Sequence, residues 1–64
     1  MKHEYKDNVG KRALIEWGIS GMIEVKIIEV SPSGFHAKIQ SHNHTEWVPC
    51  YKHDILEILP EMSL

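Results

Sequence analysis

The segment IEVKIIEVSPSGFHAKI, residues 23–39, constrains the fold most, because its alternation of apolar and polar residues changes phase once. Its first three apolar residues alternate with charged ones, but Ile28 directly follows Ile27, and Val30 resumes the alternation on the opposite parity. Side chains of a strand point alternately to two faces, so a phase change requires a surplus residue or an exposed apolar one. The segment therefore predicts β structure with one irregularity.

A turn is predicted in the middle of this segment, at the sequence SPSG of residues 31–34. Serine, proline and glycine occupy the first, second and fourth positions, where a type I turn favours them. A hairpin that closes directly on this turn pairs Val30 with Phe35 and Ile28 with Ala37. These four apolar residues would then share one face.

Continuing that pairing without a break would set the charged Lys26 opposite Ile39. We therefore expect one surplus residue near Lys26 or Ile27, a β-bulge that lets Val25 face Ile39 and bends the strand. A strand bent in this way suits a small barrel, because it contributes to two parts of the sheet. The alternative is that Ile27 is an exposed apolar residue.

The rest of the chain completes an all-β pattern of five short strands. Besides residues 23–30, strands are predicted at residues 12–17, 35–40, 45–50 and 55–59. Residues 41–44 predict a turn in which Asn43 adopts a left-handed backbone conformation, and residues 50–54 are long enough only for one tight helical turn. This spacing predicts a partly open barrel or sandwich without a crossover helix.

Composition limits the chain to one small domain. It has 64 residues, 42% of them hydrophobic, near the size at which a single core only just offsets the entropy of folding. We predict a domain over residues 11–64, preceded by a mobile or loosely docked N-terminal arm over residues 1–10, which are polar and aperiodic. The lone Cys50 excludes an internal disulfide, and no apolar run suits a membrane span or signal peptide, so a cytoplasmic location is expected.

Two segments resemble the Src-homology-3 (SH3-like) barrel family. ALIEW at residues 13–17 resembles the family's first strand, Ala-Leu-aromatic-acid-aromatic, and WVPCY at residues 47–51 resembles its late strand, proline, short helical turn and tyrosine. Together they cover about ten of the 64 residues. The resemblance implies a five-stranded SH3-like small barrel with a short helical turn before the last strand. The chain also resembles small bacterial and phage proteins.

The chain departs from the family where peptide-binding members hold polyproline ligands. The long acidic loop between the first two strands is absent, and the tyrosine follows the proline too closely. The resemblance therefore supports the barrel more than it supports proline-rich ligands. Of the family's groove residues, Trp17 and Tyr51 are the aromatic positions that correspond, with Pro49 between them and Glu16 as one acidic residue.

The leading functional hypothesis is a non-enzymatic module that binds a protein or peptide through an exposed aromatic patch. If the strands pair as predicted, His36, Lys38 and Trp47 face solvent on adjacent strands, with Tyr51 beyond Pro49. Tryptophan and tyrosine are over-represented in binding hot spots. Trp17 is a further candidate, although either tryptophan alone is also explained by core packing.

Two other binding functions are considered. In a nucleic-acid module the same aromatics would stack single-stranded RNA bases, but the formal net charge of -2 shows no excess of positive charge. In a self-assembling subunit or homodimer, the strand over residues 55–59 would pair with another copy. No basic amphipathic helix suggests a membrane partner.

Metal binding and catalysis are not expected. His42 and His44 lie close enough in the predicted turn to share a metal ion, with His36 or Cys50 as a third ligand, but the ligand spacing of a structural zinc site is missing. Cys50 with His36 or His53 supplies a nucleophile and a base in principle. A small barrel fills its interior with side chains, however, so we expect no substrate cavity, no enzyme activity and no cofactor.

Overall fold

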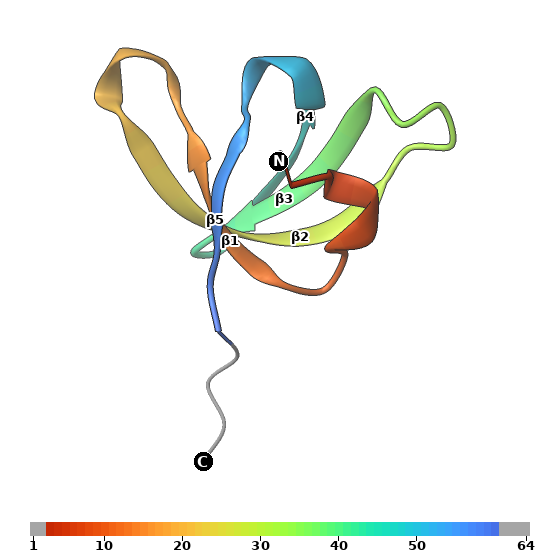
Figure 1. The fold of residues 1–64 in the computed structure, drawn as a ribbon, viewed down its shortest axis with the longest axis horizontal. Coiled ribbons are helices and arrows are strands. Elements are labelled where there is room, and N and C mark those ends of the chain that lie inside the picture. Colours follow the sequence, from red (N-terminus) through yellow and green to blue (C-terminus); the bar gives the residue numbers. More distant parts are fainter. Residues whose placement is uncertain (1–2, 61–64) are drawn as a thin grey trace.

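The computed structural model describes residues 3–60, and Figure 1 shows them as a curved sheet with short helical turns. The five strands are β1 (Arg12–Glu16), β2 (Met22–Val30), β3 (His36–Ser41), β4 (His44–Pro49) and β5 (Ile55–Ile58). Three single-turn 3₁₀ helices accompany them: η1 (Tyr5–Asp7), η2 (Gly18–Ser20) and η3 (Cys50–Lys52). The prediction of an all-β chain with five strands and one helical turn before the last strand is therefore confirmed.

The strands form one antiparallel sheet in the order β4-β3-β2-β1-β5. Strands β4 and β5 are its two edges and are not hydrogen-bonded to each other. The sheet is thus not a closed barrel, and the prediction of a barrel is wrong in this respect, because no backbone hydrogen bonds join β4 to β5. The long β2 bends at its middle, where its first part leaves β3 and continues beside β1 alone (Figure 1).

The predicted bulge in β2 is present, one residue beyond the expected position. Ile27 pairs with Ile39 and Glu29 pairs with Lys38, so Ile28 is the surplus residue. Ile27, and not Val25, therefore faces Ile39. Ile27 is completely buried, so the alternative in which it is an exposed apolar residue is wrong.

The turn between β2 and β3 explains this displacement. The Gly34 amide donates to the Ser31 carbonyl at 2.9 Å, which confirms the turn at SPSG. The ladder begins only where the Ser31 amide donates to the His36 carbonyl, also at 2.9 Å, and the Ser31 hydroxyl accepts from the His36 amide at 3.2 Å. Val30 consequently pairs with Ala37, and the predicted pairing of Val30 with Phe35 is wrong.

The core lies on the concave side of the sheet and is almost entirely aliphatic. Alternate residues of β1, β2 and β3 supply it, as expected for a sheet with one buried face, and β4 and β5 add one buried residue each. Partly buried residues, Trp17 and Cys50 among them, pack against its margin. The buried strand residues are Ala13, Ile15, Val25, Ile27, Ala37, Ile39, Val48 and Ile55.

The described part of the predicted N-terminal arm, residues 3–10, packs against the sheet. Tyr5 is buried in the core, and its hydroxyl donates to the His53 carbonyl at 2.5 Å. Gly10 donates its amide to the Ile27 carbonyl at 2.7 Å, which ties the segment to β2. Asn8 is also buried and donates from Nδ2 to the Glu4 carbonyl at 2.6 Å. This segment therefore contributes a core residue that the sequence pattern did not indicate.

The turn between β3 and β4 joins Ser41 to His44, which pair across it. His42 adopts the left-handed conformation, with φ at 57°, in place of the predicted Asn43. Histidine tolerates this region better than most residues with a Cβ atom. The turn therefore lies where predicted, but His42 and not Asn43 has the left-handed backbone conformation.

Candidate functional site

Four of the predicted binding residues lie on the outer face of β3 and β4. Directly paired residues of antiparallel strands share a face, and His36 pairs with Pro49 while Lys38 pairs with Trp47. The intervening Ala37 and Val48 are buried on the opposite face. His36, Lys38 and Trp47 thus share the outer face of two adjacent strands.

Charges of opposite sign flank this face. Glu29 of β2 pairs with Lys38, which in turn pairs with Trp47, so the three side chains form a row across three strands. The indole of Trp47 remains largely accessible, with 47% of the residue exposed. Lys38 is therefore flanked in the sheet by an acidic and an aromatic residue, and the row as a whole has no strong positive charge.

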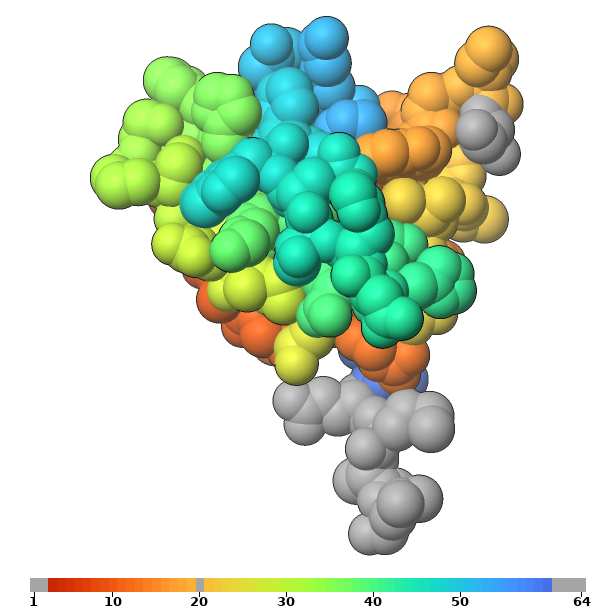
Figure 2. All heavy atoms as spheres, turned by 180° about the vertical axis from the view of Figure 1, so that it is seen from behind, coloured from red at the N-terminus to blue at the C-terminus, as the bar shows by residue number. Residues whose placement is uncertain are grey.

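Tyr51 lies around the end of β4 from this row, on η3, and borders a different surface. It is 73% exposed and lines a hollow of about 380 Å³ together with Phe35, which is 66% exposed. The Cys50 amide donates to the Phe35 carbonyl at 2.8 Å, which fixes η3 beside the β2–β3 turn. Figure 2 shows these two segments, in blue and light green, side by side at one end of the molecule.

Phe35 is the site residue that the sequence pattern assigned wrongly. Its parity with Ala37 and Ile39 predicted a core position, but the strand begins only at His36 and the phenyl ring lies beyond the closed part of the core. The SPSG turn is the sequence feature that could have indicated an exposed Phe35, because a residue immediately after such a turn lies at the rim of the sheet. We call the exposed aromatic side chains Phe35, Trp47 and Tyr51 the aromatic rim.

Trp17, the remaining predicted binding residue, belongs to the margin of the core. It is partly buried against the core cluster, and its ring stacks on His53 with centroids 4.5 Å apart and planes inclined by 25°. His53 is held in place by a 3.0 Å contact between Nδ1 and the Glu16 carbonyl. Trp17 therefore does not line the hollow that Phe35 and Tyr51 share.

The floor of the hollow contains two ionisable groups with perturbed pKa values. Burial raises the pKa of Tyr5 well above its ordinary value, and the nearby Cys50 and Asp54 add to the effect. Burial also raises the pKa of the Cys50 thiol, with a further contribution from Glu4. A thiol with a raised pKa is a poor nucleophile at neutral pH. Neither His36 nor His53 makes a side-chain hydrogen bond with Cys50 within residues 3–60.

The histidines of the β3–β4 turn lie beside one carboxylate. His44 Nε2 is 3.4 Å from a carboxylate oxygen of Glu46, and His42, His44 and Glu46 line the same hollow. Across the described residues, no group of three or more histidine, cysteine, aspartate or glutamate side chains has the geometry to hold a metal ion.

Comparison with known proteins gives no relative from which a function is transferred. No protein-family model, curated protein or solved structure matches the chain. Within residues 3–60, no helix has the length and apolar character needed to cross a lipid bilayer. The functional argument therefore depends on the geometry of the site.

Proposed function

We propose that this chain has an SH3-like architecture with an open sheet and acts as a non-enzymatic binding module for a peptide segment of another protein. Three features support the SH3-like architecture: five strands, a long β2 that bends at Ile28 and pairs with β1 and β3 in turn, and a helical turn directly before β5. The absence of a long loop between β1 and β2 leaves the aromatic rim as the principal candidate surface.

The distribution of aromatic side chains carries the proposal. The chain has two tryptophans, two tyrosines and one phenylalanine, and three of these five, Phe35, Trp47 and Tyr51, are exposed. A small domain has few large side chains with which to fill its core, and burying them would increase its stability. Their retention outside the core therefore supports binding, since large aromatic side chains are over-represented in binding hot spots.

The chemistry of the hollow favours a peptide over a nucleic acid. Two carboxylates, Glu4 and Asp54, line it next to Phe35 and Tyr51, together with the ammonium group of Lys6. Carboxylates at the edge of an aromatic hollow repel phosphates and suit a peptide that carries an apolar or proline residue beside a basic one. On the outer face, Glu29 next to Lys38 has the same effect on phosphates.

The two edge strands argue against self-assembly by strand pairing. Strand β5 has four residues and a register shift against β1 that leaves Leu56 unpaired, and Pro60 follows it. Strand β4 ends at Pro49, which has no amide hydrogen to donate. Short, irregular and proline-terminated edges are the usual protection against edge-to-edge association.

Substitution of the rim tests the proposal. We expect Trp47→Ala and Tyr51→Ala each to abolish capture of a partner from native lysate by the immobilised protein, with an unchanged melting temperature. Leu56→Ala is the matched control, because Leu56 is also an exposed apolar residue but lies on β5, away from the rim. Equal capture by all three variants would contradict the proposal. Salt-sensitive retention on heparin that Lys38→Ala removes would instead assign the surface to nucleic acid.

A further inference from the structure

The first part of β2 has a free backbone edge in the middle of the sheet. Strand β2 pairs with β1 from Met22 to Lys26, but its pairing with β3 starts only at Lys26, opposite Gln40. Beyond that point β3 turns away at His42 toward β4. Residues 22–25 of β2 therefore have a neighbouring strand on one side only.

The hydrogen-bond alternation shows which backbone groups face the free side. Both backbone groups of Ile27 bond toward the β1 side, to Gly10 and Lys11, and the Gly21 carbonyl accepts from Trp17. Backbone groups of successive strand residues point to opposite sides, so those of Ile23 and Val25 face β1 as well. The amide and carbonyl groups of Met22 and Glu24 consequently face the free side, where no strand of the described chain pairs with them.

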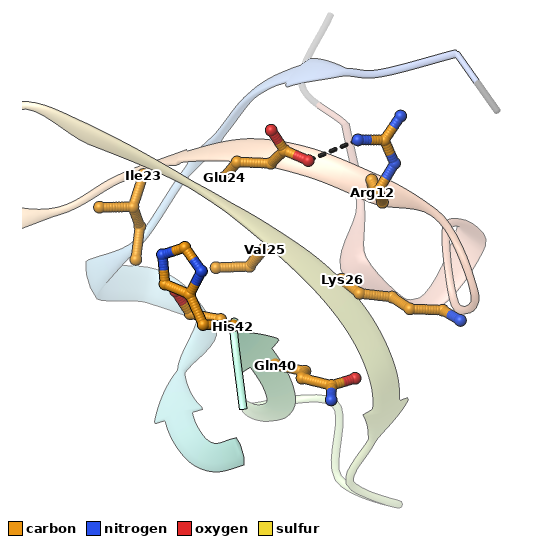
Figure 3. Close-up of a pocket in the computed structure, with 8 residues that line it drawn as sticks. Arg12, Ile23, Glu24, Val25, Lys26, Gln40 and His42 are labelled. Carbon is orange, nitrogen blue, oxygen red and sulfur yellow. Dashed lines mark hydrogen bonds and ion pairs between the residues drawn. The ribbon is translucent and has the colours of Figure 1, made fainter. Parts of the chain in front are cut away.

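Two hollows flank this edge, one on each face of β2. One, of about 530 Å³, is lined by Arg12, Glu24, Lys26 and Gln40 and is shown in Figure 3. The other, of about 590 Å³, is lined by Trp17 and the β3–β4 turn. Both share the same three lining residues: Ile23, Ser41 and His42. An extended chain places successive side chains on opposite faces, so one peptide along this edge would fill both hollows alternately.

The charges of the first hollow indicate which side chain it accepts. Arg12 and Glu24 form an ion pair at 2.5 Å and neutralise each other (Figure 3). Lys26 extends apart from this pair and forms no ion pair with another described residue. The remaining charge of the hollow is therefore positive, whereas Trp17 and Ile23 give the second hollow an apolar wall.

We propose that residues 22–25 of β2 are a second binding site, where an extended peptide of a partner protein adds as a strand. Its backbone bonds to the amide and carbonyl groups of Met22 and Glu24, as in other cases of β-strand addition. Alternate side chains are acidic, toward Lys26, and apolar, toward Trp17. The site is separate from the aromatic rim and does not depend on the function proposed for it.

Hydrogen exchange measured by NMR on the full chain provides the first test. In the free protein the amides of Met22 and Glu24 exchange rapidly, while those of Ile23 and Val25 are protected by β1. A capped peptide with alternating valine and glutamate, Val-Glu-Val-Glu-Val, is the probe. It should slow exchange at Met22 and Glu24 at least tenfold. Protected Met22 and Glu24 amides in the free protein would overturn the proposal, and protection that grows with protein concentration would assign the edge to a second copy instead.

Position 24 offers a matched pair of variants, because its amide hydrogen faces the free side. Glu24→Pro removes that donor without removing a bond to β1, and Glu24→Ala loses the same ion pair but keeps the donor. We expect the affinity for the probe to fall at least tenfold in Glu24→Pro relative to Glu24→Ala. The same affinity in both variants, with β1–β2 amides still protected, would contradict strand addition.

The charge preference is tested at Lys26 with a second probe in which lysine replaces each glutamate. The wild type should bind the glutamate peptide at least tenfold more tightly than the lysine peptide, and Lys26→Glu should reverse this preference. Equal binding of the two peptides by the wild type would overturn the assignment of an acidic partner. Phe35→Ala and Tyr51→Ala should leave both affinities unchanged, which separates this site from the aromatic rim.

Discussion

The two faces of the sheet use side chains in opposite ways. The concave face is filled by isoleucine, valine and alanine, whereas the convex face and the rim expose Phe35, Trp47 and Tyr51. A narrow, strongly bent sheet leaves room for branched aliphatic side chains but little for large rings. The buried aliphatic residues therefore stabilise the fold, whereas the exposed aromatic residues are available for a partner. The predictions below test this difference.

The largest effect is expected inside the sheet. Ile27→Ala should lower the free energy of unfolding by about 2–5 kcal/mol, because it leaves a cavity in a completely buried site. Ile19→Ala is the matched control, since Ile19 lies fully exposed in η2 and its truncation should cost less than about 0.5 kcal/mol. Urea denaturation of both variants measures the difference. Similar losses at the two positions would contradict the assignment of the core.

An intermediate loss of stability is expected at Tyr5, which is the aromatic residue buried in the core. Tyr5→Phe keeps the ring but removes the hydrogen bond to the His53 carbonyl, which should cost about 1–2 kcal/mol. Chemical denaturation at neutral pH measures this loss. No loss would show that the hydroxyl bond does not hold the N-terminal segment in place.

The burial of Tyr5 also predicts that the stability of the fold depends on pH in the alkaline range. Burial raises the pKa of Tyr5 in the folded state, so the neutral phenol contributes stability that is fully present below the pKa of an unfolded tyrosine, about 10. This contribution is lost as the pH rises above that value. The stability difference between the wild type and Tyr5→Phe should therefore shrink, and then reverse, in denaturation curves measured from pH 8 to pH 12. A constant difference would contradict burial of the hydroxyl.

A smaller effect is expected at the ion pair on the convex face. The side chains of Arg12 and Glu24 are both partly exposed, and Arg12 also donates to the Pro60 carbonyl at 3.1 Å. Arg12→Ala should cost no more than about 1 kcal/mol, and less in high salt, because exposed pairs are screened by solvent and ions. Thermal melting at low and high ionic strength provides the measurement. A loss comparable to that of Ile27→Ala would contradict the distinction between the two faces.

Local features of the fold were predictable from the sequence. The turn at residues 31–34 follows from serine, proline and glycine at favoured positions, and the bulge follows from consecutive Ile27 and Ile28. The outer positions of Lys38 and Trp47 follow from simple alternation. These features depend on neighbouring residues, so a single sequence contains the necessary information.

Features that depend on distant contacts were not predictable in the same way. Tyr5 is buried because its hydroxyl reaches the carbonyl of His53, 48 residues away, although its own segment is polar and aperiodic. The bulge lies at Ile28 because Ser31 pairs with His36, which lengthens the connection and moves Phe35 out to the rim. Trp17 lies at the core margin because it stacks on His53, a residue of the distant β4–β5 connection.

The most direct measurement is the thermal stability of a variant in which the whole rim is removed, Phe35→Ser with Trp47→Ser and Tyr51→Ser, together with its capture of partners from native lysate. If these aromatics serve binding, the variant melts cooperatively within about 5 °C of the wild type, as expected for surface substitutions in a small domain, and captures no partner. A variant that no longer unfolds cooperatively, or that retains the captured partner, would contradict the separation of a folding face from a binding rim.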